Sequence, residues 1–413
     1  MSGYARRVPA DSAPILSRLV QLDAELTERC DNDCIHCCIN LPAGDKAARA
    51  RELTTEQWKD VLRQAADLGC LQVRFTGGEP LLRPDFEELY LFARRLGLAV
   101  LLFTNARRVT PGLADLLARI PPREPVEVTV YGMQRESYEA VSRVPGSYAQ
   151  FRRGVDLLLE RGVPFVVKGV ALPPNRPDMD EFEEWAATLP GMTEPPGYVV
   201  LLDLRNRRDD AEKNRLIASL RLPPEDAVAL LTRDEEEYRA EAAAFAARFM
   251  GPPGADLFRC GAGHAISIDA YGRAQPCMGV RAPDLTVDVL TSSLVETLDR
   301  FAGLRELRAT NPEYLRRCAA CSLHGFCEQC PAKSWAEHGT LDTPVEYLCE
   351  VAHAQARRLG WLEGNEKGWN RRYRSNSSTG DPQASPKENE PPHDPREEDL
   401  DEAAADGPRA RQG

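Results

Sequence analysis

Apolar and polar residues alternate along 20–27, the pattern of a strand with one buried face. A different pattern follows from Thr54, where capping-type residues open an amphipathic helix that runs to about Leu68. The two patterns then take turns along the chain as far as residue 205. The predicted strands cover 20–27, 72–76, 98–104, 126–131, 165–172 and 198–204, and the predicted helices cover 54–68, a segment after Asp85, 111–120, 135–142, 148–162 and 178–189.

Strands that alternate with helices in this way are parallel and are joined by right-handed crossovers. The strand at 98–104 is apolar almost throughout, which is typical of a sheet covered by helices. The pattern therefore predicts an α/β fold with six parallel strands. Periodicity alone does not decide whether the sheet is open or closed into a barrel.

The length of 413 residues allows two folded units and a tail. Between 206 and 254 the chain is charged and helical, and we interpret this part as a bridge between the units. Cysteines are dense from Cys260 onward, and beyond about residue 375 Ser, Pro, Glu and Asp dominate, a composition typical of disorder. The predicted divisions are an N-terminal extension (1–19), the α/β domain (20–205), the bridge (206–254), a cysteine-rich domain (255–362) and a disordered acidic tail (363–413).

The net charge of −12 argues against a nucleic-acid partner, because no basic stripe balances it. We expect no membrane association either, since no apolar run approaches the ~20 residues of a membrane span. The N-terminus has no apolar core of a signal peptide. Twelve cysteines without an export signal indicate a reducing cytoplasm, where clustered thiols bind metal rather than form disulfides.

Three cysteines follow the first strand with the spacing C-x3-C-x2-C: Cys30, Cys34 and Cys37. Three thiolates on one loop can hold three irons of a [4Fe–4S] cube and leave the fourth iron without a protein ligand. Cubes that only carry electrons normally take four cysteines, so this loop suggests that another molecule binds the open iron. A partial zinc site or unpaired buried cysteines are the alternatives.

Gly77, Gly78 and Glu79 come where the second strand ends. Glycines at this place let a polar ligand approach the backbone closely, and Glu79 supplies a carboxylate for an ammonium group. Gly-Gly-Glu-Pro is also common in turns. The motif gains weight because it lies one strand downstream of the three cysteines.

Together, the cysteine loop with His36 before its last cysteine and the Gly-Gly-Glu motif resemble the radical S-adenosylmethionine (SAM) superfamily. The resemblance implies a partial (β/α)6 TIM-type barrel and a [4Fe–4S] cluster whose open iron is chelated by SAM. It implies that Gly77, Gly78 and Glu79 bind the SAM amino group, that Arg143 pairs with the SAM carboxylate, and that Thr129 faces SAM. An arginine suits a carboxylate because its planar fork gives two parallel hydrogen bonds. Ordinary roles, a strand threonine and a surface arginine, are the alternatives.

Seven further cysteines resemble the pattern of a SPASM domain, which binds auxiliary [4Fe–4S] clusters in enzymes that modify peptides and proteins. The resemblance implies one cluster on Cys318, Cys321, Cys327 and Cys349, and a share in a second cluster for Cys260, Cys277 and Cys330. Two features depart from the pattern: the last pair is spaced x2, and no eighth cysteine lies near Cys260. The second cluster would then have an open iron, or His264 or the substrate as a ligand. A four-cysteine zinc ribbon is the alternative for 318–330.

Cys38 and Cys70 belong to neither set, and we expect both to be small buried side chains. Asn105 follows the third strand and could line the same mouth of the barrel, although turn formation explains it equally well.

The resemblance implies an enzyme that cleaves SAM to a 5′-deoxyadenosyl radical and removes hydrogen from a substrate. Our first interpretation is maturation of a ribosomally synthesised precursor peptide through a C–S or C–C crosslink. A flavodoxin or ferredoxin would supply electrons, and a separate protein could recognise a leader peptide. Anaerobic sulfatase maturation is a rival, but Met278 stands where those enzymes carry an aspartate base. Tetrapyrrole or redox-cofactor maturation, and a non-catalytic iron–sulfur or zinc scaffold, remain open.

Overall fold

The computed structural model describes residues 19–232, 238–239 and 252–371. Six parallel strands follow one another across its main sheet, each hydrogen-bonded to the next. The prediction of an α/β fold with six parallel strands is confirmed, although the last strand is shorter than 198–204. These strands are β1 (Gln21–Thr27), β4 (Gln72–Gly77), β5 (Ala99–Thr104), β6 (Val126–Val130), β7 (Phe165–Val170) and β8 (Gly197–Val199).

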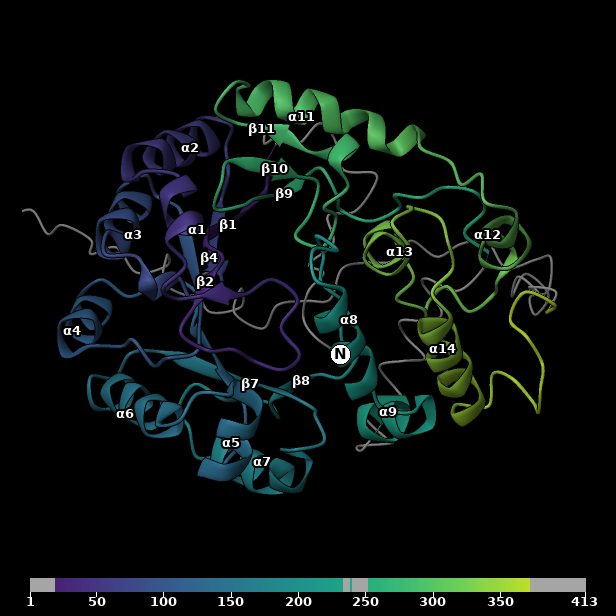
Figure 1. Cartoon of the computed structure of the whole chain (residues 1–413), viewed down its shortest axis with the longest axis horizontal. Coiled ribbons are helices and arrows are strands. Elements are labelled where there is room, and N and C mark those ends of the chain that lie inside the picture. Colours follow the sequence, from purple (N-terminus) through teal and green to yellow (C-terminus); the bar gives the residue numbers. More distant parts are fainter. Residues whose placement is uncertain (1–18, 233–237, 240–251, 372–413) are drawn as a thin grey trace, which may run out of the picture. The chain divides into compact units, whose positions relative to one another are not determined.

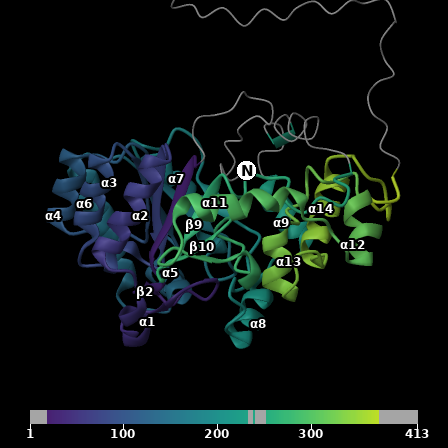
Figure 2. The ribbon, with the colours of Figure 1, turned by 90° about the horizontal axis from the view of Figure 1, so that it is seen from above.

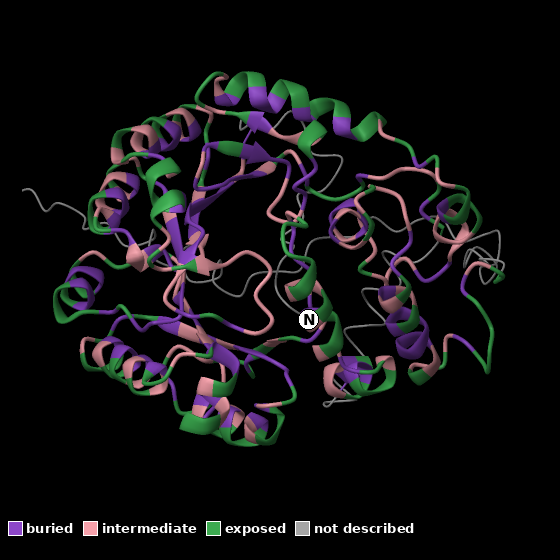
Figure 3. Ribbon diagram, viewed as in Figure 1, coloured by how far each residue is buried: buried purple, intermediate pink, exposed green. Residues whose placement is uncertain are grey.

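Helices lie along the outer side of these strands and turn their buried faces towards them (Figures 1 and 3). Local sequence sets where they begin. Thr54 and Gln57 form a capping box at the start of α2, and Thr110 caps α4, whose first residue is a proline. The outer helices are α2 (Thr55–Asp67), α3 (Phe86–Arg95), α4 (Pro111–Arg119), α5 (Arg135–Ser142), α6 (Ser147–Glu160) and α7 (Met179–Ala186).

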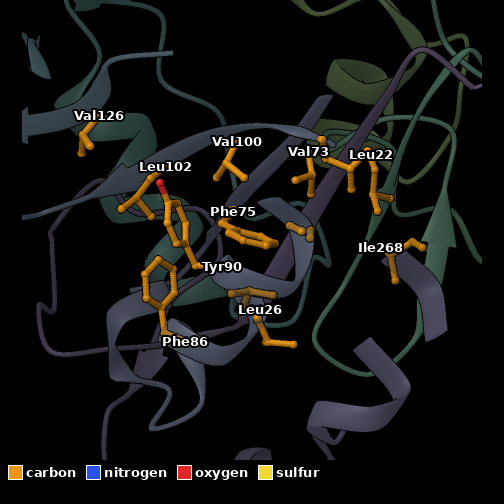
Figure 4. Packing of buried hydrophobic residues seen from close by; sticks show 14 of the residues in the cluster. Leu22, Leu26, Val73, Phe75, Phe86, Tyr90, Val100, Leu102, Val126 and Ile268 are labelled. Carbon is orange, nitrogen blue, oxygen red and sulfur yellow. The ribbon is translucent and has the colours of Figure 1, made fainter. Parts of the chain in front are cut away.

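The main hydrophobic core fills the space between the sheet and these helices (Figure 4). Leu22, Val73 and Val100 occupy equivalent positions on neighbouring strands, and all are fully buried. Phe86 and Tyr90 of α3 pack against Phe75 on the side of the sheet that faces the helices. Because side chains alternate along a strand, this arrangement turns the residues in between to the other face of the sheet.

That other face carries ion pairs. Asp23 of β1 accepts from Arg74 of β4 at 2.8 Å, and Glu127 pairs with Lys168 on the neighbouring strand. Burial raises the pKa of Asp23, with Arg74 opposing the shift. Charges removed from water are costly unless they are paired, so their presence indicates an interior built for polar contacts.

The first strands of the cysteine-rich region join the same sheet. β9 (Ala265–Ile268) runs parallel to β1, with Leu22 opposite Ile266, and a hairpin continues to β10 (Arg273–Gln275) and β11 (Val287–Asp288). The sheet therefore has nine strands among the described residues, in the order β11-β10-β9-β1-β4-β5-β6-β7-β8. Our sequence interpretation did not foresee this continuity between the two regions.

The described part of the bridge consists of α8 (Ala211–Leu220) and α9 (Pro224–Leu231). Ile217 of α8 packs against residues of the barrel, and Ala227 and Val228 of α9 pack on α14 (Glu346–Arg358). Figures 1 and 2 show α9 next to α14. The bridge thus contacts both regions through apolar faces. Most of the predicted charged helix after residue 232 lies outside the described residues.

None of the helices in the described chain has the length and apolar character that a membrane span requires. Residues 363–371 are described and pack on the cysteine-rich region, so the predicted disordered tail begins too early at 363; 1–18 and 372–413 lie outside the described residues. The remaining elements are β2 (Arg29–Cys30), β3 (Leu41–Pro42), α1 (Lys46–Arg51), α11 (Leu294–Ala302), α12 (Pro312–Arg316), α13 (Pro331–His338) and the 3-10 turns at Pro80–Leu82, Arg176–Asp178, Pro283–Leu285, Gly303–Glu306 and Cys318–Ala320.

Candidate active site and cysteine groups

Cys30, Cys34 and Cys37 lie on one loop after β1, as the spacing predicts. Burial raises the pKa of the Cys34 thiol most, and the neighbouring Cys37 raises it further. The pKa of Cys30 is raised by burial, by Glu79 and by both other thiols. The Cys30 and Cys34 thiols need a positive partner to become thiolates, which an iron–sulfur cluster supplies. The donor set therefore fits such a group.

Contacts from distant segments hold this loop. The backbone nitrogens of Asp33 and Ile35 donate to carbonyls at the end of α5, at 2.9 and 3.0 Å. Asn105 donates to Asp31 at 2.9 Å and lies 3.8 Å from the Cys30 sulfur, so it does line the mouth. Arg108 also pairs with Asp31, at 2.9 Å. The loop is therefore fixed against the ends of β5 and α5 rather than by its own sequence.

The two glycines of the Gly-Gly-Glu motif make a close approach to the chain's own backbone. Gly77 has φ +123°, and a Cβ atom there would lie 2.2 Å from the Thr27 carbonyl oxygen. At Gly78 a Cβ would lie 2.3 Å from the carbonyl oxygen of Arg29. Our interpretation gave these glycines to a ligand, whereas the structure fills the space with the strand that leads into the cysteine loop.

Glu79 is 1% exposed and its carboxylate accepts three hydrogen bonds from the protein. The donors are the Leu81 nitrogen (3.0 Å), the Thr104 hydroxyl (2.9 Å) and the Asn105 nitrogen (2.9 Å). Burial, followed by the charge of Asp31, raises the pKa of Glu79 to about 7. Glu79 therefore ties the end of β4 to the end of β5, directly beside Cys30.

Of the other predicted SAM contacts, His36 belongs to the loop, Arg143 contacts it, and Thr129 lies on β6. Thr129 is partly buried on β6, on the ion-paired face and opposite Lys168. Arg143 is exposed, has φ 58° and pairs with Asp33 of the loop at 3.3 Å. His36 lies on the loop with its ring 5.9 Å from that of Tyr131, and burial lowers its pKa to about 4, so it is neutral at pH 7.

Three residues of this site were missed from the sequence. The Tyr131 hydroxyl hydrogen-bonds the Cys34 thiol, an interaction that favours the thiolate. Lys213 of α8 donates to the Cys34 carbonyl oxygen at 2.7 Å, and Arg205 donates to that of Asn40 at 3.4 Å. An aromatic residue two positions after Thr129 was an available signal for Tyr131, but nothing local indicated Arg205 at the end of the α/β domain or Lys213 in the bridge.

Four cysteines of the C-terminal region line one cavity together with Arg317, His353 and Trp369. They come from three segments, and the structure brings them to the same cavity. Burial raises the pKa of Cys321 to about 11 and that of Cys318 to about 12, with the Cys349 thiol adding to both shifts. We call Cys318, Cys321, Cys327 and Cys349 the four-thiol group.

Cys277, Cys330 and Cys260 form a second group. Burial raises the pKa of Cys277 to about 12, and Cys330 and then Cys260 contribute to that shift. Cys330 precedes Pro331 at the start of α13, where the nitrogens of Ala332 and Lys333 hydrogen-bond its sulfur and favour the thiolate. Cys260 is exposed.

His264, Cys38 and Cys70 lie in different parts of the structure. His264 is exposed beside a turn closed by Gly261. Cys70 is buried in the main core, as predicted. Cys38 is only partly buried, and burial and the adjacent Cys37 raise its pKa.

Across the described ranges, no three His, Cys, Asp or Glu side chains converge closely enough to hold a single metal ion. Zinc draws four ligands onto one centre, whereas a cube carries one cysteine on each iron and keeps the sulfurs further apart.

Residues 24–188 match the family model of the Radical SAM superfamily. This segment holds the cysteine loop, the Gly-Gly-Glu motif and strands β4–β7. This part of the chain is therefore similar to radical SAM enzymes, which use SAM with a [4Fe–4S] cluster.

Three curated relatives narrow the comparison. The AdoMet-dependent heme synthase of Methanosarcina barkeri is 23% identical over 76% of this chain and 92% of its own length. The mycofactocin maturase of Mycolicibacterium smegmatis is 28% identical over 78% of this chain and 80% of its own. The PqqA peptide cyclase of Streptomyces rochei is 47% identical, but over only 23% of this chain and 25% of its own length.

Two solved structures share the fold. The native enzyme anSMEcpe with bound AdoMet has a TM-score of 0.59 at 14% identity, covering 83% of this chain and 98% of its own. SuiB of Streptococcus suis bound to the precursor peptide SuiA has a TM-score of 0.55 at 15% identity, covering 78% and 74%. At such identities the likeness concerns the fold, including the partial barrel.

Proposed function

We propose that this enzyme modifies a peptide and leaves a C–S or C–C crosslink in a ribosomally synthesised precursor. One hydrogen atom would leave an unactivated C–H bond for the 5′-deoxyadenosyl radical, the second hydrogen would leave the partner group as a proton, and the leftover electron would pass to an auxiliary cluster. The observation that carries the proposal is the similarity to a peptide cyclase and to a mycofactocin maturase, combined with two cysteine groups beyond the barrel. In this proposal the four-thiol group, and Cys260, Cys277 and Cys330, each bind an auxiliary [4Fe–4S] cluster.

In the radical site, Cys30, Cys34 and Cys37 would hold a [4Fe–4S] cluster, which supplies the electron that splits SAM into methionine and a 5′-deoxyadenosyl radical. The chain's own residues position the cysteine loop that would hold this cluster. Tyr131 donates to the Cys34 sulfur, and Lys213 holds the loop through the Cys34 carbonyl.

The proposed SAM contacts are the residues that the resemblance implies: Gly77, Gly78, Glu79, Thr129 and Arg143. Gly77 and Gly78 set the backbone beside the loop, and Glu79 presents negative charge to an ammonium group, which would lower its raised pKa. Thr129 faces the interior. Arg143 would exchange Asp33 for the SAM carboxylate, which its exposure allows.

The test begins with anaerobic purification, measurement of iron and sulfide, and addition of SAM with dithionite. We expect about twelve irons per chain, four for each cube, and formation of 5′-deoxyadenosine. With the precursor peptide present, mass spectrometry should show the loss of two hydrogens. An iron content of about four per chain would contradict the two auxiliary clusters. A peptide of unchanged mass would contradict the crosslink.

A tetrapyrrole substrate is the second candidate, favoured by the alignment with heme synthase over 92% of that relative. The same assay separates the two, because an iron tetrapyrrole and a peptide are added in parallel and only the true substrate is consumed. Electron delivery by a flavodoxin or ferredoxin, leader recognition by a separate protein and a cytoplasmic location belong to the peptide proposal.

Sulfatase-type maturation has less support. Met278 follows Cys277 at the position of the aspartate base, and methionine has no carboxylate. The Met278 carbonyl oxygen accepts a hydrogen bond from Asn206 at 3.3 Å.

A further inference from the structure

The four-thiol group lies in a cavity that its cysteines do not close by themselves. Arg317, His353 and Trp369 line the same cavity. Trp369 belongs to residues 363–371, which follow α14 and the helix-ending turn at Gly360. We call 363–371 the strap.

Gly368 fixes the strap to the walls of the cavity through both of its backbone groups. Its nitrogen donates to Nε2 of His353 at 3.0 Å, and its carbonyl oxygen accepts from the nitrogen and the hydroxyl of Ser322 at 3.0 and 2.9 Å. His353 therefore carries its proton on Nδ1, which donates to the Cys349 carbonyl oxygen at 2.7 Å. This chain of hydrogen bonds joins the strap to one cysteine through His353 and to the neighbour of another through Ser322.

Gly368 also sets how closely the strap approaches. A Cβ atom at this position would lie 2.7 Å from the sulfur of Cys321 and 2.6 Å from Cγ of Leu323. Both distances are shorter than real Cβ contacts. Any larger residue must either lift the strap or displace the sulfur of a cysteine that the proposed cluster needs.

Trp369 completes the cover. Its ring meets that of His353 edge-on with centroids 5.2 Å apart, and the guanidinium of Arg317 lies 4.7 Å from its centroid. Arg317 in turn donates to the Cys349 sulfur at 3.4 Å and pairs with Glu346 at 2.9 Å. The strap thus holds a positive charge against a cysteine of the group.

We propose that the strap is the closing wall of the four-thiol site: Gly368 admits it against Cys321, and Trp369 holds His353 and Arg317 in place around the bound cluster. This inference rests on the proposed auxiliary cluster at these four cysteines. Its residues are positioning residues, since they contact the cysteines rather than the substrate. Partners that orient metal ligands commonly change metal affinity when they are replaced.

The test measures anaerobic release of iron to a chelator from the full-length, cluster-loaded protein. The double variant Cys318→Ala/Cys321→Ala identifies the irons that belong to the four-thiol group. For Trp369→Ala and Gly368→Ala we expect this fraction to leave about 10-fold faster than in the parent protein. Trp369→Phe, which keeps an aromatic ring, should restore most of the retention, and Asn365→Ala, an exposed change in the same strap, should behave like the parent.

The outcomes separate the two proposals. If the parent protein lacks the irons that the double variant should lose, the auxiliary cluster itself is wrong. If those irons are present and leave Trp369→Ala at the parent rate, the strap is not a wall of the site. Should Gly368→Ala fail to fold, judged by circular dichroism, the Trp369 pair decides alone. A midpoint potential that becomes more negative in Arg317→Gln would independently support the positive charge at Cys349.

Discussion

The radical-site loop and the four-thiol group both bring thiols together, but they do so in different ways. Cys30, Cys34 and Cys37 lie within eight residues of one another and depend on distant segments only to fix their loop. The four-thiol group gathers cysteines across 32 positions and needs the strap to close it. The loop is fixed by contacts with the ends of β5 and α5, whereas the four-thiol group lies in a cavity that the strap also lines.

The largest effect expected at the loop follows loss of a ligand. Cys34→Ala should reduce 5′-deoxyadenosine formation to background, because the open-iron cluster loses one of its three protein ligands. The measurement is product formation with SAM and dithionite after anaerobic reconstitution. Cys70→Ala, in the main core, is the matched control, and equal loss in both variants would contradict a special role for Cys34.

Gly78→Ala should be nearly as damaging, because its Cβ would lie 2.3 Å from a backbone oxygen that cannot move without shifting the cysteine loop. We expect a loss of about 3 kcal/mol in unfolding free energy, together with a lower yield of loaded cluster. Thermal unfolding and iron content measure the two. Gly112→Ala on α4, where nothing lies within 4 Å of a Cβ, should change neither. If Gly78→Ala behaves like the parent protein, the close backbone is not the reason for glycine at this position, and access for a ligand remains as the reason.

Lys213→Met should affect the cysteine loop but not the four-thiol group, because it changes a contact that the bridge makes with the loop. SAM cleavage should fall about 10-fold because the Cys34 carbonyl loses its 2.7 Å donor, while iron retention by the four-thiol group should stay at the parent level. Lys46→Met, an exposed change on α1, is the control. A loss of iron from both groups would show that α8 acts on the whole fold instead.

Glu25 provides the smallest expected effect. Burial raises its pKa to about 7, with Arg281 opposing the shift. Since the folded pKa lies above the ordinary value, the stability that Glu25 contributes is complete below about pH 4.5 and is lost as the pH rises through 7. The unfolding free energy of the parent relative to Glu25→Gln should fall by about 2 kcal/mol from pH 5 to pH 8.

Chemical unfolding at each pH measures this difference, with exposed Glu87→Gln on α3 as the control. A difference that does not change with pH would place the pKa of Glu25 near its ordinary value.

The parts of the molecule that depend on local order could be predicted from the sequence. Alternation at 20–27 and the capping residues at Thr54 led to β1 and α2, and the spacing of Cys30, Cys34 and Cys37 led to one loop. Contacts between distant segments could not be predicted in this way. The pairing of Leu22 with Ile266 and the donation from Lys213 depend on where the chain returns in space, which no periodicity encodes.

The strap shows a further limit. Its polar composition indicated a tail, and the exception was Trp369, a large aromatic residue among Gly, Asn, Lys and Arg. An aromatic side chain in such a stretch gains little unless it packs, and this was the available signal. For Gly77 and Gly78 the residue type was significant but its reason was different: the close neighbour is the chain itself.

The parallel pairing of β9 with β1 has a consequence for biosynthesis. The partner of β1 at Ala265–Ile268 is made only some 240 residues after β1 itself. Until then, one edge of β1 offers unpaired backbone groups to any other strand nearby. The barrel half can form first, but it is completed only when the cysteine-rich half arrives, so a chain that stops before residue 265 would expose a sticky edge.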